Sequence, residues 1–133
     1  MEALSAADTG EAKGDFMVKH IAFTMYPVSD MARARRFYEK GLGLKVTHDF
    51  GGKWVEYHLG NGCFAITTMA TGVNPSANAG GSIAFEVENV DAAVAALTAA
   101  KAAVKVPAFD SPVCRMAVMT DTEGNAFSLH AKK

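Results

Sequence analysis

Two histidines and one glutamate in the first half of the chain are the side chains best suited to hold a metal ion. Glu56 and His58 lie two positions apart, so on an alternating strand both point to the same face. His48 lies on the preceding predicted strand. Imidazole and carboxylate groups bind zinc and other divalent transition metals. One hypothesis is therefore a metal site. The other, which we favour, is that all three are surface polar residues on the exposed side of a curved sheet.

The cysteines and the glycine-rich segments indicate no further catalytic arrangement. Cys63 and Cys114 have no CxxC spacing and no adjacent histidine that would mark an activated thiol. We expect free thiols in a reducing, cytoplasmic compartment rather than a disulfide. Gly60-Asn61-Gly62 and Gly80-Gly81 are typical of turns, and neither precedes a helix as a dinucleotide-binding motif would.

Length and charge restrict the classes of partner. The chain has 133 residues, enough for one compact domain with a sizeable core. It carries 13 basic and 14 acidic residues, so it has no basic surplus to neutralise nucleic-acid phosphates. Its apolar runs are shorter than the roughly 20 residues of a membrane span, and we find no secretory signal. We therefore expect neither nucleic acid nor membrane as a partner. Residues 1–16 differ in composition, and we expect an N-terminal tail, a stretch ahead of an alternative start at Met17, or sequence added to the natural chain.

An internal repeat organises the rest of the chain. Ile21-Ala22-Phe23 returns as Ile83-Ala84-Phe85, and an acidic loop residue and an Ala-rich helical stretch follow each copy. A long repeat that is present only twice indicates two similar modules around a pseudo-twofold axis, not a solenoid. Such modules place equivalent strands side by side with a cleft between them, and this cleft is the expected place of function.

Hydrophobic periodicity and turn residues predict an α+β fold with the order β-α-β-β-β in each module. In module one (17–70) we expect a helix at 31–40 that buries Ala34, Phe37 and Tyr38, and strands at 19–25, 44–48, 54–59 and 63–69. A linker at 71–81 leads to module two (82–131). There we expect a helix at 90–102 and strands at 82–87, 104–107, 114–120 and 126–130.

Two stretches of the chain carry a resemblance to a known family. They are Pro27-Val28-Ser29-Asp30 followed by Ala34-Arg35-Arg36-Phe37-Tyr38 and Leu42-Gly43-Leu44, and Asp121-Thr122-Glu123-Gly124-Asn125 before the final strand. With these motifs, residues 17–131 resemble the vicinal oxygen chelate superfamily of glyoxalase I, bleomycin-resistance proteins and extradiol dioxygenases. The resemblance implies one domain of paired βαβββ modules that form a curved mixed sheet around a cleft, often in a homodimer. Because this fold hosts several reactions, it does not define one.

Enzymes of this superfamily hold a divalent metal through His, Glu or Gln at one position on each of four strands. The resemblance carries these positions onto Phe23, Thr67 (or Ala65), Ser82 and Ser128. A phenyl ring and neutral hydroxyls are poor ligands for such a metal. We therefore expect no metal at these positions and no cofactor. Aligning the copies by their repeated tripeptide instead pairs His20 with Ser82, but one histidine alone cannot hold a metal.

Strand alternation predicts an apolar cleft with a few polar anchors. We expect Trp54 and Phe23 to stack on a planar ligand, and Glu86 and Arg115 to fix its charge. The alternative is that the large apolar residues simply fill the barrel interior. The expected cleft residues are Phe23, Met25, Trp54, Glu56, Thr67, Ser82, Glu86, Arg115, Ser128 and His130, with Met119 as a further wall residue.

Three functions follow from these patterns. We favour a metal-free binding protein of the bleomycin-resistance type, a homodimer that encloses a small organic molecule. The second is a divalent-metal-dependent lyase or dioxygenase with non-standard ligands such as His20, His48, Glu56 or His58. The third is an interaction or regulatory module without a ligand. An isolated module leaves a sheet edge and an apolar face open, so the modules must close on each other or on a second chain.

Overall fold

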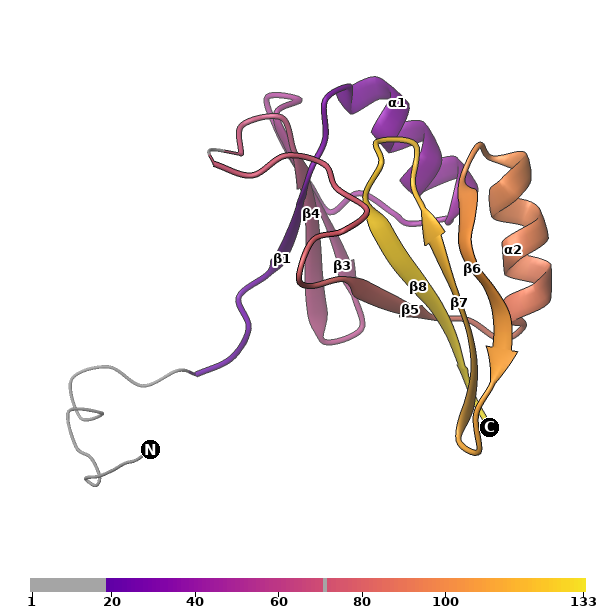
Figure 1. Cartoon of the computed structure of the whole chain (residues 1–133). Coiled ribbons are helices and arrows are strands. Elements are labelled where there is room, and N and C mark those ends of the chain that lie inside the picture. The colour runs from indigo at the N-terminus through magenta and orange to yellow at the C-terminus, as the bar shows by residue number, and fades with distance from the viewer. Residues whose placement is uncertain (1–18, 71) are drawn as a thin grey trace.

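The computed structural model describes residues 19–70 and 72–133. The expected tail at 1–16 and residue 71 of the linker lie outside the described residues. The described part of the chain forms two four-stranded sheets, each accompanied by a helix, in the order βαβββ twice (Figure 1). This confirms the predicted α+β fold of paired βαβββ modules.

Both sheets have the same strand order. The first is β1-β4-β3-β2 and the second is β5-β8-β7-β6, with the first two strands of each list parallel and the others antiparallel. The strands are β1 (Thr24–Pro27), β2 (His48–Phe50), β3 (Trp54–Leu59), β4 (Gly62–Thr67), β5 (Ile83–Glu86), β6 (Ala103–Asp110), β7 (Cys114–Thr120) and β8 (Ala126–Lys132).

The two helices begin at side-chain caps. Helix α1 (Met31–Arg35) continues as the π-helix η2 (Arg36–Gly41), and helix α2 spans Val90–Ala99. The Asp30 and Asn89 side chains accept from the amides three residues on, at 3.0 and 2.9 Å, which satisfies donors that a helix start leaves free. The predicted buried stripe of α1 and η2 is confirmed, since Ala34, Phe37 and Tyr38 are all buried. In the described part of the chain, no helix has the length and apolar character needed to cross a membrane.

The prediction of a strand at 44–48 is wrong, because this segment pairs with β3 only from its last two residues onward. The Leu44 amide donates to the Tyr38 carbonyl at 3.0 Å, which ties this segment to the end of η2. The first bond to β3 is from Thr47 to Glu56, at 2.8 Å. The apolar residues at 42–46 pack against the core as an irregular connection instead. These residues are apolar because they are buried, although they pair with no strand. Hydrophobic periodicity alone does not distinguish such a buried irregular segment from a strand.

The repeated tripeptide is three positions out of step with the structural repeat. Tyr26 in β1 lies opposite Ile66, and Phe85 in β5 lies opposite Leu129, at the same place in each sheet. Both residues precede their helix cap, Asp30 or Asn89, by four positions. The equivalent of Phe85 is therefore Tyr26 and not Phe23. The tripeptide did mark the start of each module, but not its register.

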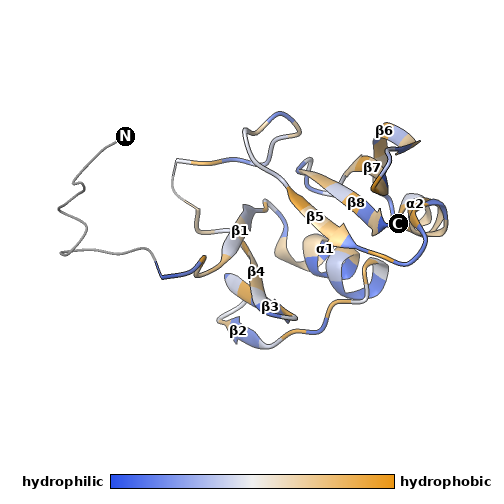
Figure 2. Cartoon of the chain, turned by 90° about the horizontal axis from the view of Figure 1, so that it is seen from below, coloured by the Kyte–Doolittle hydropathy of each residue, from blue (hydrophilic) through white to orange (hydrophobic). Residues whose placement is uncertain are grey.

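One face of each sheet is buried in a single shared core. The Phe64 ring of β4 lies 5.8 Å from the Phe85 ring of β5, and Phe37 of η2 lies 5.7 Å from Phe127 of β8. Seen from below, the first helix lies between the two sheets (Figure 2). Aromatic rings that meet edge to face, as Phe64 and Phe85 do, add to the stabilisation that burial provides. The consequence for function is that the other face of each sheet points away from this core.

Polar groups join the modules at the edge of the core. The Tyr26 hydroxyl donates to the Ala126 carbonyl at 2.7 Å and accepts from the Ile83 amide at 2.8 Å. The Tyr38 hydroxyl donates to the Asp121 carboxylate. Burial, followed by the charge of Asp121, raises the pKa of Tyr38, so this hydroxyl keeps its proton.

The turn before β8 caps the first helix from the other module. Glu123 accepts hydrogen bonds from the Ser29 and Asp30 amides, both at 3.1 Å, and from Arg33 Nε at 2.6 Å. Burial alone would raise the pKa of Glu123. The hydrogen bonds from Arg33 and from the amides of Asp30 and Ser29 outweigh burial and lower this pKa to about 2.

Candidate functional site

The open face of the first sheet brings five of the predicted cleft residues together. Met25, Ala65 and Glu56 lie in one row across β1, β4 and β3, and Thr67 lies opposite Trp54 in the next row. Phe23, just before β1, meets the Trp54 ring edge to face at 5.1 Å. Phe23, Met25, Trp54, Glu56 and Thr67 therefore share one surface. The Thr67 hydroxyl is buried and donates to the Lys53 carbonyl at 2.7 Å.

The open face of the second sheet carries three more of these residues. Ala84 and Glu86 of β5 lie opposite Ser128 and His130 of β8. The Glu86 carboxylate contacts His130 Nδ1 and accepts from the Lys132 amide at 2.9 Å. These hydrogen bonds, the amide first, lower the pKa of Glu86, which keeps it charged on an exposed surface. Ser128 is buried within this face, and Ser82 is exposed just before β5.

The predictions for Arg115 and Met119 are wrong, because both lie on the helix side of their sheet. Arg115 forms ion pairs with Asp91 of α2 at 2.9 Å and with Asp110 at 3.0 Å. Its hydrogen bonds with these two aspartates raise the pKa of Arg115. Met119 is fully buried opposite Phe127 in the core. Both residues have odd numbers on β7, whereas the open face of β7 carries even positions.

The two open faces do not enclose a common cleft within one chain. Each lies opposite a buried face, and the buried faces converge on the same core (Figure 2). A hollow of about 540 Å³ does lie between the modules, but of the predicted cleft residues only Glu86 lines it. Its walls include Leu42, Leu44, Ile83 and Phe85, which belong to the inner side. The predicted cleft therefore corresponds to two separate half-sites.

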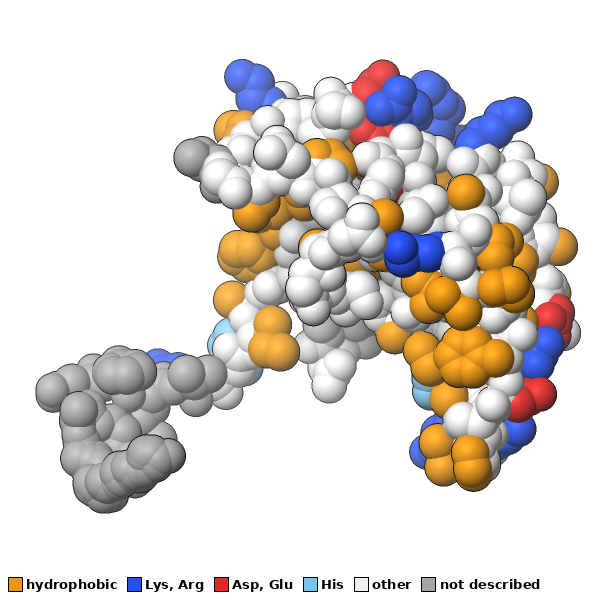
Figure 3. Space-filling view, in the orientation of Figure 1, with side chains coloured by type: hydrophobic (Ala, Val, Ile, Leu, Met, Phe, Trp, Pro, Cys, Tyr) orange, Lys and Arg blue, Asp and Glu red, His pale blue; other side chains and the backbone are white. Residues whose placement is uncertain are grey.

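Large apolar side chains lie exposed on both half-sites. On the first face, Phe50 lies opposite Trp54 and stacks on the His48 ring at 5.8 Å. On the second, Val106 and Phe109 of β6 lie opposite Val118 and Met116. Hydrophobic side chains gather over β6, β7 and β8 in Figure 3. The exposed members are Phe23, Phe50, Val106 and Phe109. Sequence reasoning missed Phe50, Val106 and Phe109, although the register of β2 and β6 would have shown them.

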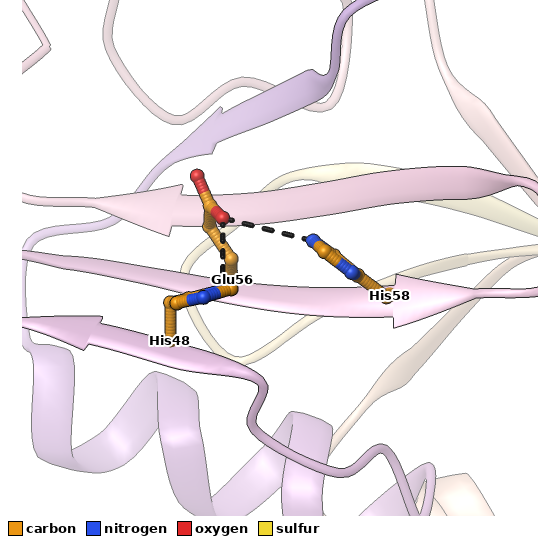
Figure 4. A group of neighbouring side chains, drawn as sticks. All are labelled: His48, Glu56 and His58. Carbon is orange, nitrogen blue, oxygen red and sulfur yellow. Dashed lines mark ion pairs between the residues drawn. The ribbon is translucent and has the colours of Figure 1, made fainter.

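A cluster of two histidines and a carboxylate lies on the first half-site. His48 of β2 is directly opposite Glu56 of β3, and His58 follows two positions later on the same face. Glu56 Oε1 lies 3.5 Å from His48 Nδ1 and 3.8 Å from His58 Nε2, and the three groups point toward one another (Figure 4). The sequence predicted that these three residues lie on the exposed side of a curved sheet. In the structure they lie on the same side of the first sheet as Trp54 and Phe23.

The superfamily's metal positions do not carry metal-binding side chains. Phe23 and Ser82 each precede their helix cap by seven positions, so they are equivalent, and His20 is not the partner of Ser82. The register makes Ala65, opposite Met25, the equivalent of Ser128, opposite Ala84. A phenyl group, a methyl group and two hydroxyls do not fit a divalent transition metal.

Two pseudo-symmetric βαβββ modules with an open face on each sheet define the class of protein as a glyoxalase-like α+β domain. The family model of the Glyoxalase/Bleomycin resistance protein/Dioxygenase superfamily matches residues 18–129. The chain therefore belongs to this superfamily. No curated protein sequence matches it.

Several solved structures have a similar fold. A glyoxalase-related enzyme from Fulvimarina pelagi has a TM-score of 0.73 at 17% identity, over 86% of this chain and 88% of that chain. TnmS3, an antibiotic binding protein from Streptomyces sp. CB03234, has a TM-score of 0.68 at 23% identity, over 89% and 99%. The fosfomycin resistance protein FosX from Listeria monocytogenes, complexed with Mn(II) and a dihydroxypropylphosphonic acid, has a TM-score of 0.67 at 18% identity, over 86% and 90%.

Proposed function

We propose that this chain binds a small organic molecule in a composite cleft, formed by the first half-site of one copy and the second half-site of another. The observation that carries the proposal is the exposure of Phe23, Phe50, Val106 and Phe109 on two faces that one chain leaves open. In this proposal residues 17–131 act as one domain, with 71–81 as the linker between its modules. In this proposal no metal ion is held at the superfamily's four metal positions.

A second copy is the occupant that best matches this geometry. A twofold axis would place the first half-site of each copy against the second half-site of the other and close two identical clefts at once. It would also cover aromatic and aliphatic groups that are costly to leave in water. Each cleft would then have a wall with Trp54 and Phe23 and a wall with the Glu86–His130 pair.

This composition supports a ligand with a planar or aliphatic body and a polar group. Aromatic walls favour stacking on a flat body, and the Glu86–His130 pair offers a carboxylate and an imidazole to its polar end. The fold likeness to an antibiotic binding protein is consistent with a binding role. A divalent-metal-dependent lyase or dioxygenase is the second candidate, and only the His48, Glu56 and His58 cluster favours it.

The oligomeric state tests the composite cleft, and two neighbouring valines provide a matched pair. Val106 lies on the open face of β6 with 39% exposure, whereas Val104 lies opposite the buried Met119 with 45% exposure. Light scattering should give the wild type twice the 14.0 kDa chain mass. Val106→Glu should shift it to a monomer, and Val104→Glu should not. A wild-type monomer at high concentration, or a dimer that survives Val106→Glu, would contradict the proposal.

Ligand binding is then measured by the fluorescence of Trp54, which is the only tryptophan in the chain. Anilinonaphthalene sulfonate, a planar aromatic anion, serves as the first probe. Binding should change the Trp54 emission in the dimer and not in the monomeric Val106→Glu variant. An equal response in both would show that the second copy does not contribute to the site.

A further inference from the structure

We propose that His48, Glu56 and His58 form a binding site for one divalent transition metal ion of the zinc class. The site lies on strands β2 and β3, apart from the four-strand positions at which the superfamily holds its metal. It depends on neither the bound organic molecule nor the second copy of the chain.

The sheet register places the three side chains together. His48 and Glu56 are directly opposite each other in an antiparallel pair, and Glu56 and His58 are neighbours on one face of β3. Each residue offers one ligand atom, an imidazole nitrogen or a carboxylate oxygen, and the three ligand atoms lie within 4.8 Å of one another. Because a sheet fixes these positions through its hydrogen bonds, the cluster is more rigid than one on a loop.

The spacing of the ligand atoms agrees with a small metal ion. With metal–ligand distances of about 2.0–2.1 Å, the ligand atoms of a tetrahedral zinc site lie about 3.4 Å apart. The two distances from Glu56 Oε1, 3.5 and 3.8 Å, are close to this value. Both distances are longer than a usual hydrogen bond between nitrogen and oxygen, so the two histidines lie beside Glu56 Oε1 without bonding to it directly.

Neighbouring residues hold the glutamate and one histidine in orientation. Trp54 Nε1 donates to Glu56 Oε2 at 2.9 Å, which leaves Oε1 directed at the two imidazoles. The Phe50 ring lies parallel to the His48 ring within 14°. Metal sites typically have such outer partners, which fix the ligating atoms before the ion arrives. A solvent-exposed ion pair needs no such support.

The exposure of the cluster permits entry and leaves coordination positions free. The His48 and His58 side chains are 54% and 51% exposed, and that of Glu56 is 21% exposed. Two histidines and one glutamate are a ligand set of catalytic zinc sites, in which a water or ligand atom takes the fourth position. An ion held here would present that position on the half-site with Trp54, and it would polarise an oxygen of a molecule bound there.

The proposal is tested by titrating the untagged protein with Co(II), whose visible absorption reports the coordination of the ion. Wild type should bind one Co(II) per chain, with the visible absorption of an ion in a coordination site of low symmetry. Added Zn(II) should displace the Co(II) and remove this absorption. Loss of a residue that merely orients a ligand lowers metal affinity about 10–100-fold, so loss of a ligand should lower it at least about 100-fold. His48→Gln, Glu56→Gln and His58→Gln should each show this loss.

Two further variants make the test specific. Trp54→Phe keeps an aromatic ring but removes the indole N–H that donates to Glu56 Oε2, and it should weaken Co(II) binding about 10-fold while one equivalent still binds. Glu88→Gln removes an exposed carboxylate just before α2, outside the cluster, and should leave Co(II) binding unchanged. The three ligand side chains are partly exposed, so their variants should keep the wild-type circular dichroism spectrum.

Two results would overturn the proposal. One is a wild type that takes up neither Co(II) nor Zn(II) at micromolar concentrations. The other is binding that persists unchanged in all three ligand variants, which would place the ion elsewhere. A metal site confirmed in a strict monomer would leave this proposal standing and refute the composite cleft.

Discussion

The charge of the Glu123 carboxylate should stabilise the folded domain, and Glu123→Gln tests this. Its side chain is fully enclosed, and it receives two backbone amides from the start of α1 and the guanidinium of Arg33. Glutamine keeps the shape and one acceptor oxygen but removes the charge. The variant therefore isolates the electrostatic part of the link between the modules.

The magnitude follows from the pKa. Each pKa unit corresponds to about 1.4 kcal/mol. A carboxyl whose pKa is lowered from 4.5 to about 2 therefore contributes about 3 kcal/mol to the free energy of unfolding. Arg33 is 45% exposed, so water screens part of this interaction, and we expect about 2 kcal/mol. Because the folded pKa is lowered, this contribution is complete above about pH 4.5. It is lost as the pH falls through the folded pKa of about 2.

The assay is urea unfolding of both proteins at one fixed concentration, from pH 7 down to pH 2.5. At pH 7, Glu123→Gln should be less stable by about 2 kcal/mol, which is roughly 5–10 °C in melting temperature for a domain of this size. The difference should narrow below about pH 4.5. Glu88→Gln, which changes an exposed glutamate before α2, is the control and should alter stability by less than about 0.5 kcal/mol. A difference that stays constant down to pH 2.5 would refute the electrostatic reasoning.

Two further predictions concern the shared core. Tyr26→Phe removes both hydrogen bonds of the hydroxyl to β5 and β8, and it should lower the free energy of unfolding by about 1–3 kcal/mol in urea denaturation. No measurable loss would mean that water replaces the hydroxyl at this junction. Phe127→Ala removes a ring that contacts both Phe37 and Phe85, and it should cost about 3–5 kcal/mol, whereas the exposed Val104→Ala should cost less than about 1 kcal/mol. Equal losses in these two variants would contradict the placement of the core.

The elements of the fold could be predicted because local signals agreed with the tertiary structure. The bounds predicted for the strands at 54–59 and 114–120 are those observed, since turn residues flank alternating side chains in both. The stripe of Ala34, Phe37 and Tyr38 was visible from helical spacing. The strand at 44–48 could not be told from an irregular apolar segment, because both bury the same residue types.

The site was predicted in its parts but not in its arrangement. Alternation predicted that Phe23 and Met25 share one face, and in the structure they lie on the same face as Trp54. It could not say that the two open faces point apart, because that depends on which faces share the core. Arg115 was misplaced for a related reason: its charge suggested a ligand anchor, whereas Asp91 of α2 supplies its partner on the helix side.

The hydroxyl of Tyr26 also fixes the order of the two modules along the chain. Its structural equivalent in module two is Phe85, which has the same ring and no oxygen. If module two were duplicated to replace module one, the Ile83 amide and the Ala126 carbonyl would lose the partner that joins them to β1. The two halves are therefore similar in backbone but no longer interchangeable. One oxygen atom thus distinguishes module one, which donates and accepts through Tyr26, from module two, which supplies the Ala126 carbonyl and the Ile83 amide. The linker at 71–81 lies next to this contact, whereas the turn at 60–62 does not. A circular permutant should therefore tolerate new termini better at 60–62 than within the linker.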